Sequence, residues 1–139
     1  PVYGRLYNWD AAMKVCPLGW RLPSDGDYKI LENDQGMVPD DLDKTGFRES
    51  GDVGFKLKSF LGWEYLNGNN SSGFNALPGG YRSSVDELSY GLTYYGFFWT
   101  STTDESAYAF LREMSLSRHS VGRRYNNRDL AISVRCIKN

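Results

Sequence analysis

The sequence has few of the features that most functional classes require. It contains one histidine, two cysteines and no long apolar run among its 139 residues. Without an apolar run of about 20 residues, no helix is predicted to cross a membrane. Sixteen lysines and arginines face seventeen aspartates and glutamates, which gives a formal net charge of −1. Because nucleic-acid-binding surfaces need an excess of positive charge, no nucleic acid is expected as a partner.

Signatures of catalysis are equally scarce. The single histidine, His119, stands in a polar segment with no adjacent nucleophile apart from common serines. The acidic pairs at residues 86–87 and 104–105 are sequence neighbours, and neighbours on an extended chain point to opposite sides. No acid–base pair of the kind that hydrolyses glycosides is therefore indicated. We expect a binding or structural protein rather than an enzyme.

Glycine and aromatic residues are what the sequence does have. It contains 15 Gly, 10 Tyr, 7 Phe and 4 Trp, with few long helical patterns. Frequent turn residues between short aromatic segments are typical of a loop-rich fold with β-structure. The length suits one domain over residues 1–139, of the α+β class, with small antiparallel sheets. Trp20, Trp63 and Trp99 are expected in its core, because large aromatic side chains bury much apolar area.

Two short helices are predicted from their capping signals. Asn8 caps a helix over residues 10–16, and Ser24 with Asp27 resembles a capping box before a helix over residues 25–33. Residues 36–54 are polar and predicted as a loop, and residues 55–61 are ambiguous between strand and helical turn. Strands are expected at residues 4–7, 96–101, 107–116, 120–125 and 131–137. The third and fourth of these form a hairpin that turns near Ser117.

Cys16 and Cys136 lie near opposite ends of the chain. Their spacing matches no common zinc pattern, and no cluster of other cysteines or histidines accompanies them. They are either a disulfide that closes almost the whole chain or two free buried thiols. A bridge over so long a loop would stabilise the fold by roughly 4–5 kcal/mol on the chain-entropy interpretation. It would also indicate an oxidising compartment.

Six ordered motifs span nearly the whole chain. They are residues 3–9 (YGRLYNW), 16–24 (CPLGWRLPS), 56–59 (KLKS), 73–82 (GFNALPGGYR), 98–102 (FWTST) and 133–136 (SVRC). In these motifs the chain resembles the Fibrobacter succinogenes major paralogous domain family, which occurs in secreted or lipid-anchored bacterial proteins.

The resemblance implies a C-type-lectin-like fold of the type shared with formylglycine-generating enzymes. In that fold a cysteine of the first helix bridges to one of the last strand, which are the places of Cys16 and Cys136. This use of both cysteines leaves none for thiol oxidation. The resemblance also implies that the termini lie side by side, as suits a module of a larger surface protein, and that the protein is extracellular or on the cell surface.

Calcium-dependent sugar binding, often associated with the lectin fold, lacks its usual motifs here. Glu-Pro-Asn, Gln-Pro-Asp and Trp-Asn-Asp are all absent. One acidic segment does follow the oxygen pattern of an EF-hand loop. Its members are Asp41, Asp43, Thr45, Gly46, Glu49 and Asp52. The last position holds an Asp in place of the usual longer Glu, and nearby glycines disfavour a following helix. A Ca²⁺ loop and a solvated acidic loop both remain open, and no cofactor is predicted.

Residues 102–128 are the predicted binding surface. They combine tyrosine and arginine, the residue types that are enriched in binding hot spots. On an extended strand, Tyr108, Phe110 and Arg112 share one face. The candidate ligand-binding residues are Tyr108, Phe110, Arg112, Leu116, Arg118, His119, Arg124, Tyr125 and Asn126. We expect a protein or glycan partner, and the alternative is a structural spacer without a ligand of its own.

The resemblance adds a hypothesis about residues 102–128. Related lectin-fold domains are the variable proteins of diversity-generating retroelements, which mutate adenines in Asn codons near the C-terminus. Relatives tend to have Asn, Ser and Tyr in this stretch, whereas this chain has Tyr, Phe, Leu, Arg, His, Gly and Asp in their places. Scrambled Asn codons yield such a mixture, and so does ordinary divergence. The hypothesis is a receptor domain diversified by a retroelement.

Overall fold

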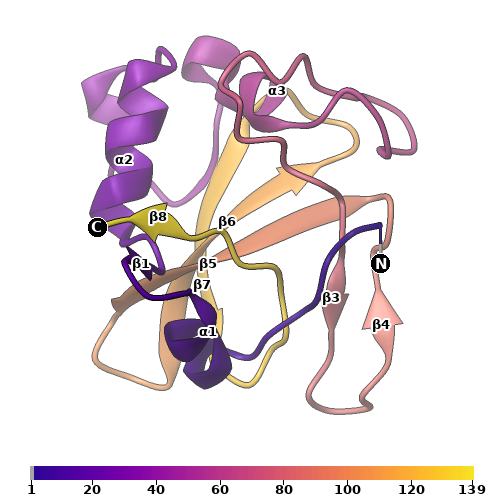
Figure 1. Ribbon diagram of the computed structural model, residues 1–139. Helices are drawn as coiled ribbons and strands as arrows, with labels where there is room; N and C mark the ends of the chain where they lie inside the picture. Colours follow the sequence, from indigo (N-terminus) through magenta and orange to yellow (C-terminus); the bar gives the residue numbers. More distant parts are fainter. Residues whose placement is uncertain (1) are drawn as a thin grey trace.

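A four-stranded antiparallel sheet forms the centre of the computed structural model, which describes residues 2–139 (Figure 1). Its strand order is β2-β7-β6-β5, from β2 (Gly46–Arg48), β5 (Tyr95–Thr103), β6 (Tyr108–Ser115) and β7 (Val121–Asn127). Two smaller antiparallel pairs flank it. They are β1 (Trp20–Arg21) with β8 (Ile137–Lys138), and β3 (Tyr81–Arg82) with β4 (Ser89–Tyr90). The predicted α+β class with small antiparallel sheets is confirmed.

Both predicted helices are present, with the predicted caps. Helix α1 spans Trp9–Val15, and the Asn8 side chain accepts a hydrogen bond from the Ala11 amide. Helix α2 spans Asp25–Asp34, and Ser24 and Asp27 form both bonds of a capping box. A third helix, α3 (Val53–Leu57), covers the first part of the segment at residues 55–61 that was ambiguous from its pattern, and Lys58 after it forms an isolated bridge to Ala76.

Residues 36–54 are more ordered than the predicted loop. They contain short 3₁₀ turns at Pro39–Asp41 and Ser50–Asp52, and the edge strand β2 lies between these turns. Gly51 makes this compactness possible, because a Cβ there would lie 2.5 Å from the backbone of Gly36. The prediction of a plain loop was therefore wrong in part.

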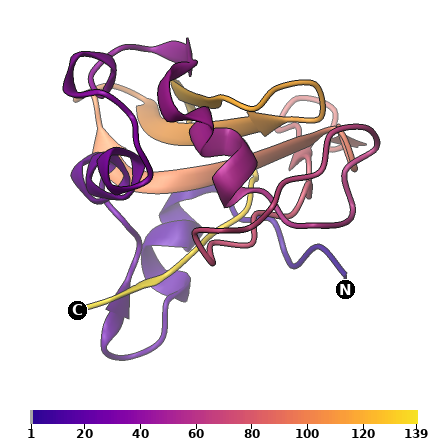
Figure 2. The ribbon, with the colours of Figure 1, turned by 90° about the horizontal axis from the view of Figure 1, so that it is seen from above.

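The hairpin of β6 and β7 is confirmed, but the two terminal strands are not. The segment at residues 4–7 contributes a single bridge, from Tyr7 to Ile132. Residues 131–133 bridge in turn to three different segments, at Ile132–Tyr7, Ala131–Arg82 and Ser133–Phe98, so they cannot form one ladder. Beyond these bridges the two ends of the chain run toward opposite sides in both views (Figures 1 and 2). The prediction that the two termini lie side by side is therefore wrong.

Two clusters of buried residues pack on the two faces of the sheet. On the face covered by α2 and α3, here called the α2 side, the buried residues are Tyr28, Met37, Val53, Leu57, Trp63, Ala76, Phe98, Met114 and Val121. On the opposite face, here called the α1 side, they are Ala12, Leu22, Trp99, Ala109, Leu111 and Ile132. In Figure 2, α1 and the C-terminal segment lie below the sheet. Neighbouring residues of one strand, such as Phe98 and Trp99, thus enter different cores.

Two of the three tryptophans expected in the core are there. Trp63 and Trp99 are buried, and the indole of Trp99 donates a 2.9 Å hydrogen bond to the Tyr7 carbonyl. Trp20 is 45% exposed, so its prediction was wrong. It lies on β1, a two-residue strand with both residues exposed. A strand this short at the edge of the molecule has no second layer to cover its side chains.

Cys16 and Cys136 form a disulfide across a sequence separation of 120 residues. It joins the end of α1 to the residue before β8. Of the two alternatives that the residues left open, the bridge is the one present. No helix within residues 2–139 is both long and apolar enough to span a bilayer.

Candidate functional site

The predicted binding residues lie in three separate places on the β6–β7 hairpin. Tyr108, Phe110 and Tyr125 share one face at the open end of the hairpin, away from its turn. Leu116, Arg118 and His119 lie at the turn, which is the other end. Arg124 and Asn126 alternate with Tyr125 and therefore point to the opposite face. The sequence analysis predicted one surface for these residues, whereas the structure places them in three separate locations.

The three aromatic side chains at the open end contact one another. Phe110 and Tyr125 are directly opposite in the β6–β7 register, with ring centroids 5.7 Å apart and planes at 79°. The Tyr108 and Tyr125 rings are 6.1 Å apart at 71°. Both pairs are edge-to-face, an arrangement that aromatic rings prefer. Tyr108 is 42% exposed and Tyr125 is 54% exposed, so these three residues, here called the aromatic cluster, offer ring surface to solvent.

A buried arginine supports the aromatic cluster from below. The Arg123 guanidinium lies 4.4 Å from the centre of the Phe110 ring, and Asp25 of α2 holds it through contacts of 2.9 to 3.2 Å. Burial acts to raise the pKa of Asp25, but hydrogen bonds from Arg123 and the charge of Arg112 outweigh burial and keep that pKa well below its usual range. Asp25 is therefore ionised, and the cluster rests on a fixed ion pair.

The same ion network reaches deeper into the α2 side through Glu32. Arg48 of β2 donates two hydrogen bonds to Glu32, at 2.8 and 3.0 Å. Arg112 of β6 pairs with both Glu32 and Asp25, the latter at 2.7 Å. Arg112 and Glu32 are completely buried. Arg112, predicted as a ligand-binding residue, therefore has no exposed surface, because α2 covers this part of the strand face that it shares with Phe110.

Residues at the turn of the hairpin have contacts of their own. Leu116 is half-buried and packs against the core on the α2 side, so only part of its side chain is exposed. Arg118 pairs with Glu49 at 3.1 Å and lies over the Phe47 ring. His119 is exposed, and its ring centroid lies 4.8 Å from that of Phe55, with the two ring planes tilted by 38°. These contacts join the turn to residues 47–49 and to α3.

The remaining two predicted residues face the α1 side. Arg124 lies 2.7 Å from the carboxylate of Glu113, across the hairpin. Asn126 is exposed, and its side chain accepts a hydrogen bond from the Asn127 amide. The residues predicted to bind a ligand include Arg124 but not Arg123, which lies beneath Phe110. The alternation rule supplied the signal for the better choice, because Arg123 and Tyr125 are two residues apart and share a face.

Three of the four carboxylates in the acidic segment with the EF-hand pattern are engaged by cations of the protein. Asp41 pairs with Lys44 at 2.8 Å, Asp43 with Lys29 at 2.5 Å, and Glu49 with Arg118. The strand β2 begins at residue 46, in the middle of the pattern. An EF-hand needs six or more oxygen ligands around one point. Within residues 2–139 no group of three or more His, Cys, Asp or Glu side chains is placed to hold a metal ion.

Comparison with known protein families gives one match. The model of the Fibrobacter succinogenes major domain matches residues 1–138. Comparison with curated proteins gives no match. Comparison with solved structures gives none either.

Proposed function

The chain belongs to the Fibrobacter succinogenes major domain family, and we propose that it is a ligand-binding module rather than an enzyme. The observation behind the proposal is the aromatic cluster of Tyr108, Phe110 and Tyr125. Two of its rings are exposed, and all three are fixed on adjacent strands. Tyrosines offer large contact areas with few rotatable bonds, so they lose little conformational entropy on binding.

Preorganisation of the aromatic cluster supports a binding role over simple surface exposure. The Phe110 ring stands on Arg123, which is 8% exposed and hydrogen-bonded to Asp25. A ring held in this way loses little conformational freedom when a partner binds. Loss of side-chain freedom is one reason why interfaces of equal buried area differ in affinity. The partner in this proposal is a protein or a glycan that contacts the ring faces and the two tyrosine hydroxyls.

The location proposed for the module is extracellular or on the bacterial cell surface, as part of a larger surface or secreted protein. The Cys16–Cys136 disulfide supports it, because disulfides persist mainly in oxidising compartments. A C-type-lectin-like fold belongs to the same proposal, supported by a disulfide that joins the first helix to the C-terminal segment. Diversification by a retroelement stays a hypothesis about residues 102–128. The alternative function is a spacer module without a ligand.

The test compares binding by two tyrosine variants. The wild-type domain, the double variant Tyr108→Ser/Tyr125→Ser and the control Tyr94→Ser are applied to a glycan array and to an array of purified extracellular proteins. Tyr94 is 45% exposed and lies outside the aromatic cluster, so Tyr94→Ser removes a similarly exposed ring at another place on the surface. We expect partners that bind wild type and Tyr94→Ser but not the double variant. A glycan or protein identity follows from the array that responds.

Two outcomes would count against the proposal. A double variant that keeps every wild-type partner at the same affinity would move the site away from the aromatic cluster. A wild-type domain with no partner on either array, together with a normal melting temperature, would favour the spacer alternative. Both outcomes require folded variants, which near-ultraviolet circular dichroism would establish.

A further inference from the structure

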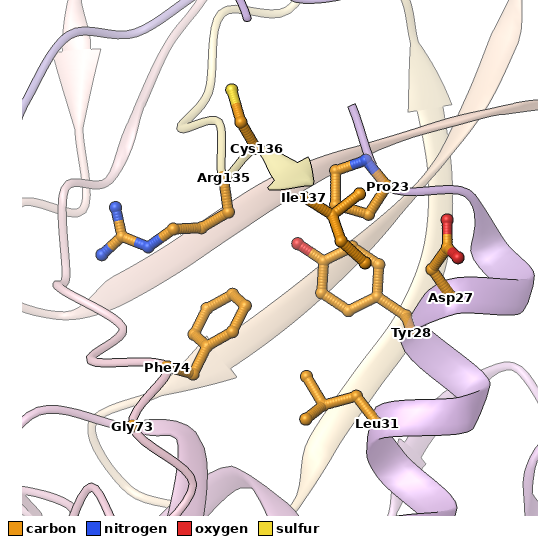
Figure 3. A pocket seen from close by; sticks show the side chains of 9 residues that line it. All are labelled: Pro23, Asp27, Tyr28, Leu31, Gly73, Phe74, Arg135, Cys136 and Ile137. Atoms are coloured by element: carbon orange, nitrogen blue, oxygen red, sulfur yellow. The ribbon is translucent and has the colours of Figure 1, made fainter. Parts of the chain in front are cut away.

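A pocket lies between α2, the segment at residues 73–74 and the C-terminal segment (Figure 3). Its volume of about 330 Å³ is at the lower end of the range found for small-molecule pockets, ~300–1,000 Å³. The residues that line it include Pro23, Tyr28, Leu31, Phe74, Arg135 and Ile137. None of them belongs to the aromatic cluster, so this pocket is independent of the proposed partner surface.

The hydroxyl of Tyr28 is the first unusual group in this pocket. Tyr28 is 2% exposed, and within residues 2–139 its hydroxyl has no hydrogen-bond partner. In Figure 3 this hydroxyl points toward the side of the pocket where Arg135 lies. Burial raises the pKa of Tyr28, which keeps the hydroxyl protonated and able to donate. A buried donor without an acceptor costs about 1–3 kcal/mol, so an acceptor in the pocket would remove a real penalty.

Arg135 is the second unusual group. Its guanidinium donates one hydrogen bond to the Asn75 carbonyl and lies over the rings of Phe74 and Phe98, at 5.7 Å from each. Arg135 is half-buried, and in the part of the chain that the structure describes it forms no ion pair, unlike the fully buried Arg48 and Arg112. Burial lowers the pKa of Arg135, but a guanidinium stays charged in proteins. The pocket thus has a positive charge with donors to spare.

The other walls of the pocket determine what else the ligand must be. Phe74, Leu31, Pro23 and Ile137 are apolar, and the one carboxylate at the edge, that of Asp27, is already bound by Arg21. A phosphate or sulfate carries close to two negative charges, whereas these walls offer a single cation, so part of the ligand's charge would be left unpaired among apolar groups. A carboxylate has two oxygens and suits two donor groups.

We propose that this pocket binds a small organic carboxylate with an apolar body. The carboxylate accepts a hydrogen bond from the Tyr28 hydroxyl and pairs with Arg135. The apolar body packs against Phe74 and Leu31. This is a site of its own and goes beyond the partner surface on the β6–β7 hairpin.

The test is a titration of the folded domain followed by two-dimensional amide NMR. The probes are sodium phenylacetate, sodium hexanoate and the neutral analogue phenylacetamide. We expect saturable shifts for one of the two carboxylates at the amides of Tyr28, Phe74 and Ile137, with at least tenfold weaker binding of phenylacetamide. Saturation by neither carboxylate at millimolar concentration would overturn the proposal, and equal binding of phenylacetamide would overturn its ionic part.

Variants assign the two polar groups. Tyr28→Phe removes only a hydroxyl that has no partner in the described residues, so we expect it to fold and to weaken carboxylate binding about tenfold or more. Arg135→Gln is expected to abolish saturation, with the exposed Arg82→Gln as its charge-matched control. Unchanged affinity in Tyr28→Phe would overturn the role of the hydroxyl even if Arg135→Gln failed to fold. The Tyr108→Ser/Tyr125→Ser variant should bind the carboxylate as wild type does, which separates this test from that of the partner surface.

Discussion

The two faces of the central sheet are held to the rest of the molecule by different kinds of interaction. On the α1 side, Leu111 and Trp99 pack among apolar residues with no exposed surface. On the α2 side, the next residue of β6, Arg112, meets Asp25 and Glu32 of α2. Apolar packing depends mainly on buried area and tolerates rearrangement, whereas an ion pair requires one geometry. Both faces have an apolar core, and the ion pairs of the α2 side additionally fix where α2 lies on the sheet.

The position of α2 matters for both proposed sites. Its Asp25 holds Arg123 beneath the aromatic cluster, and its Tyr28 lines the pocket at the C-terminal segment. Ion pairs between α2 and the sheet, which add to the apolar packing of Tyr28, therefore stabilise the geometry of both. The predictions below test this division between the faces, from the largest expected effect to the smallest.

Loss of the disulfide should be the most damaging change. Cys16→Ser or Cys136→Ser is expected to lower the free energy of unfolding by about 4–5 kcal/mol, because the bridge closes most of the chain. Urea unfolding under oxidising conditions measures this effect. The double serine variant should match either single one. An unchanged midpoint in all three would show that the bridge contributes nothing to the α1 side.

Removal of the central acid of the network should come next. Glu32→Ala leaves the buried Arg48 without a partner for its charge and leaves Arg112 with Asp25 alone, and it is expected to cost about 3–5 kcal/mol. Asp34→Ala, an exposed acid on the same helix, is the control and should change stability by no more than about 0.5 kcal/mol. If the two variants unfold alike, the ionic contact is not what positions α2.

Acid should weaken the α2 side selectively. The pKa of Asp25 in the folded protein lies below its ordinary value of 3.8. The stability that this ionised carboxylate contributes is therefore complete above that value and is lost as the pH falls from about 4 toward the folded-state pKa. Melting temperatures measured from pH 6 down to pH 2 should fall steeply below pH 4. The decline should be shallower in Asp25→Asn, and identical slopes would contradict this assignment.

Substitution of the exposed tyrosines should have the smallest effect. Tyr108→Ser and Tyr125→Ser are each expected to change the free energy of unfolding by about 1 kcal/mol or less, because both residues are about half exposed. Differential scanning calorimetry measures this. A loss of several kcal/mol would make these rings part of the core and would remove the proposed partner surface.

The helices could be predicted because their signals are local. Asn8 acts on an amide three residues away, and Ser24 and Asp27 cap each other across the same spacing. The disulfide followed from the family resemblance, not from the spacing of the two cysteines. Features of this kind need no knowledge of how the chain returns on itself.

The site could be predicted only in part, for a physical reason. Periodicity placed Phe110 and Arg112 on one face, but whether that face is open depends on α2, whose Asp25 is 87 residues earlier in the chain. The burial of Trp20 was predicted wrongly for a similar reason, because burial needs a second layer of structure that its two-residue strand does not have. The carboxylate pocket combines three distant segments, and no motif in the sequence marks it.

The Cys16–Cys136 bridge also decides how the molecule would respond to tension along its chain. A pulling force applied to the two ends passes from residue 16 to residue 136 through the covalent link, where the two Cα atoms are 5.7 Å apart. The whole four-stranded sheet, with the aromatic cluster, lies within the closed loop and bears no load. Only α1 and the segments outside the bridge can be drawn out, so a pulled domain would keep the aromatic cluster of the proposed binding face intact.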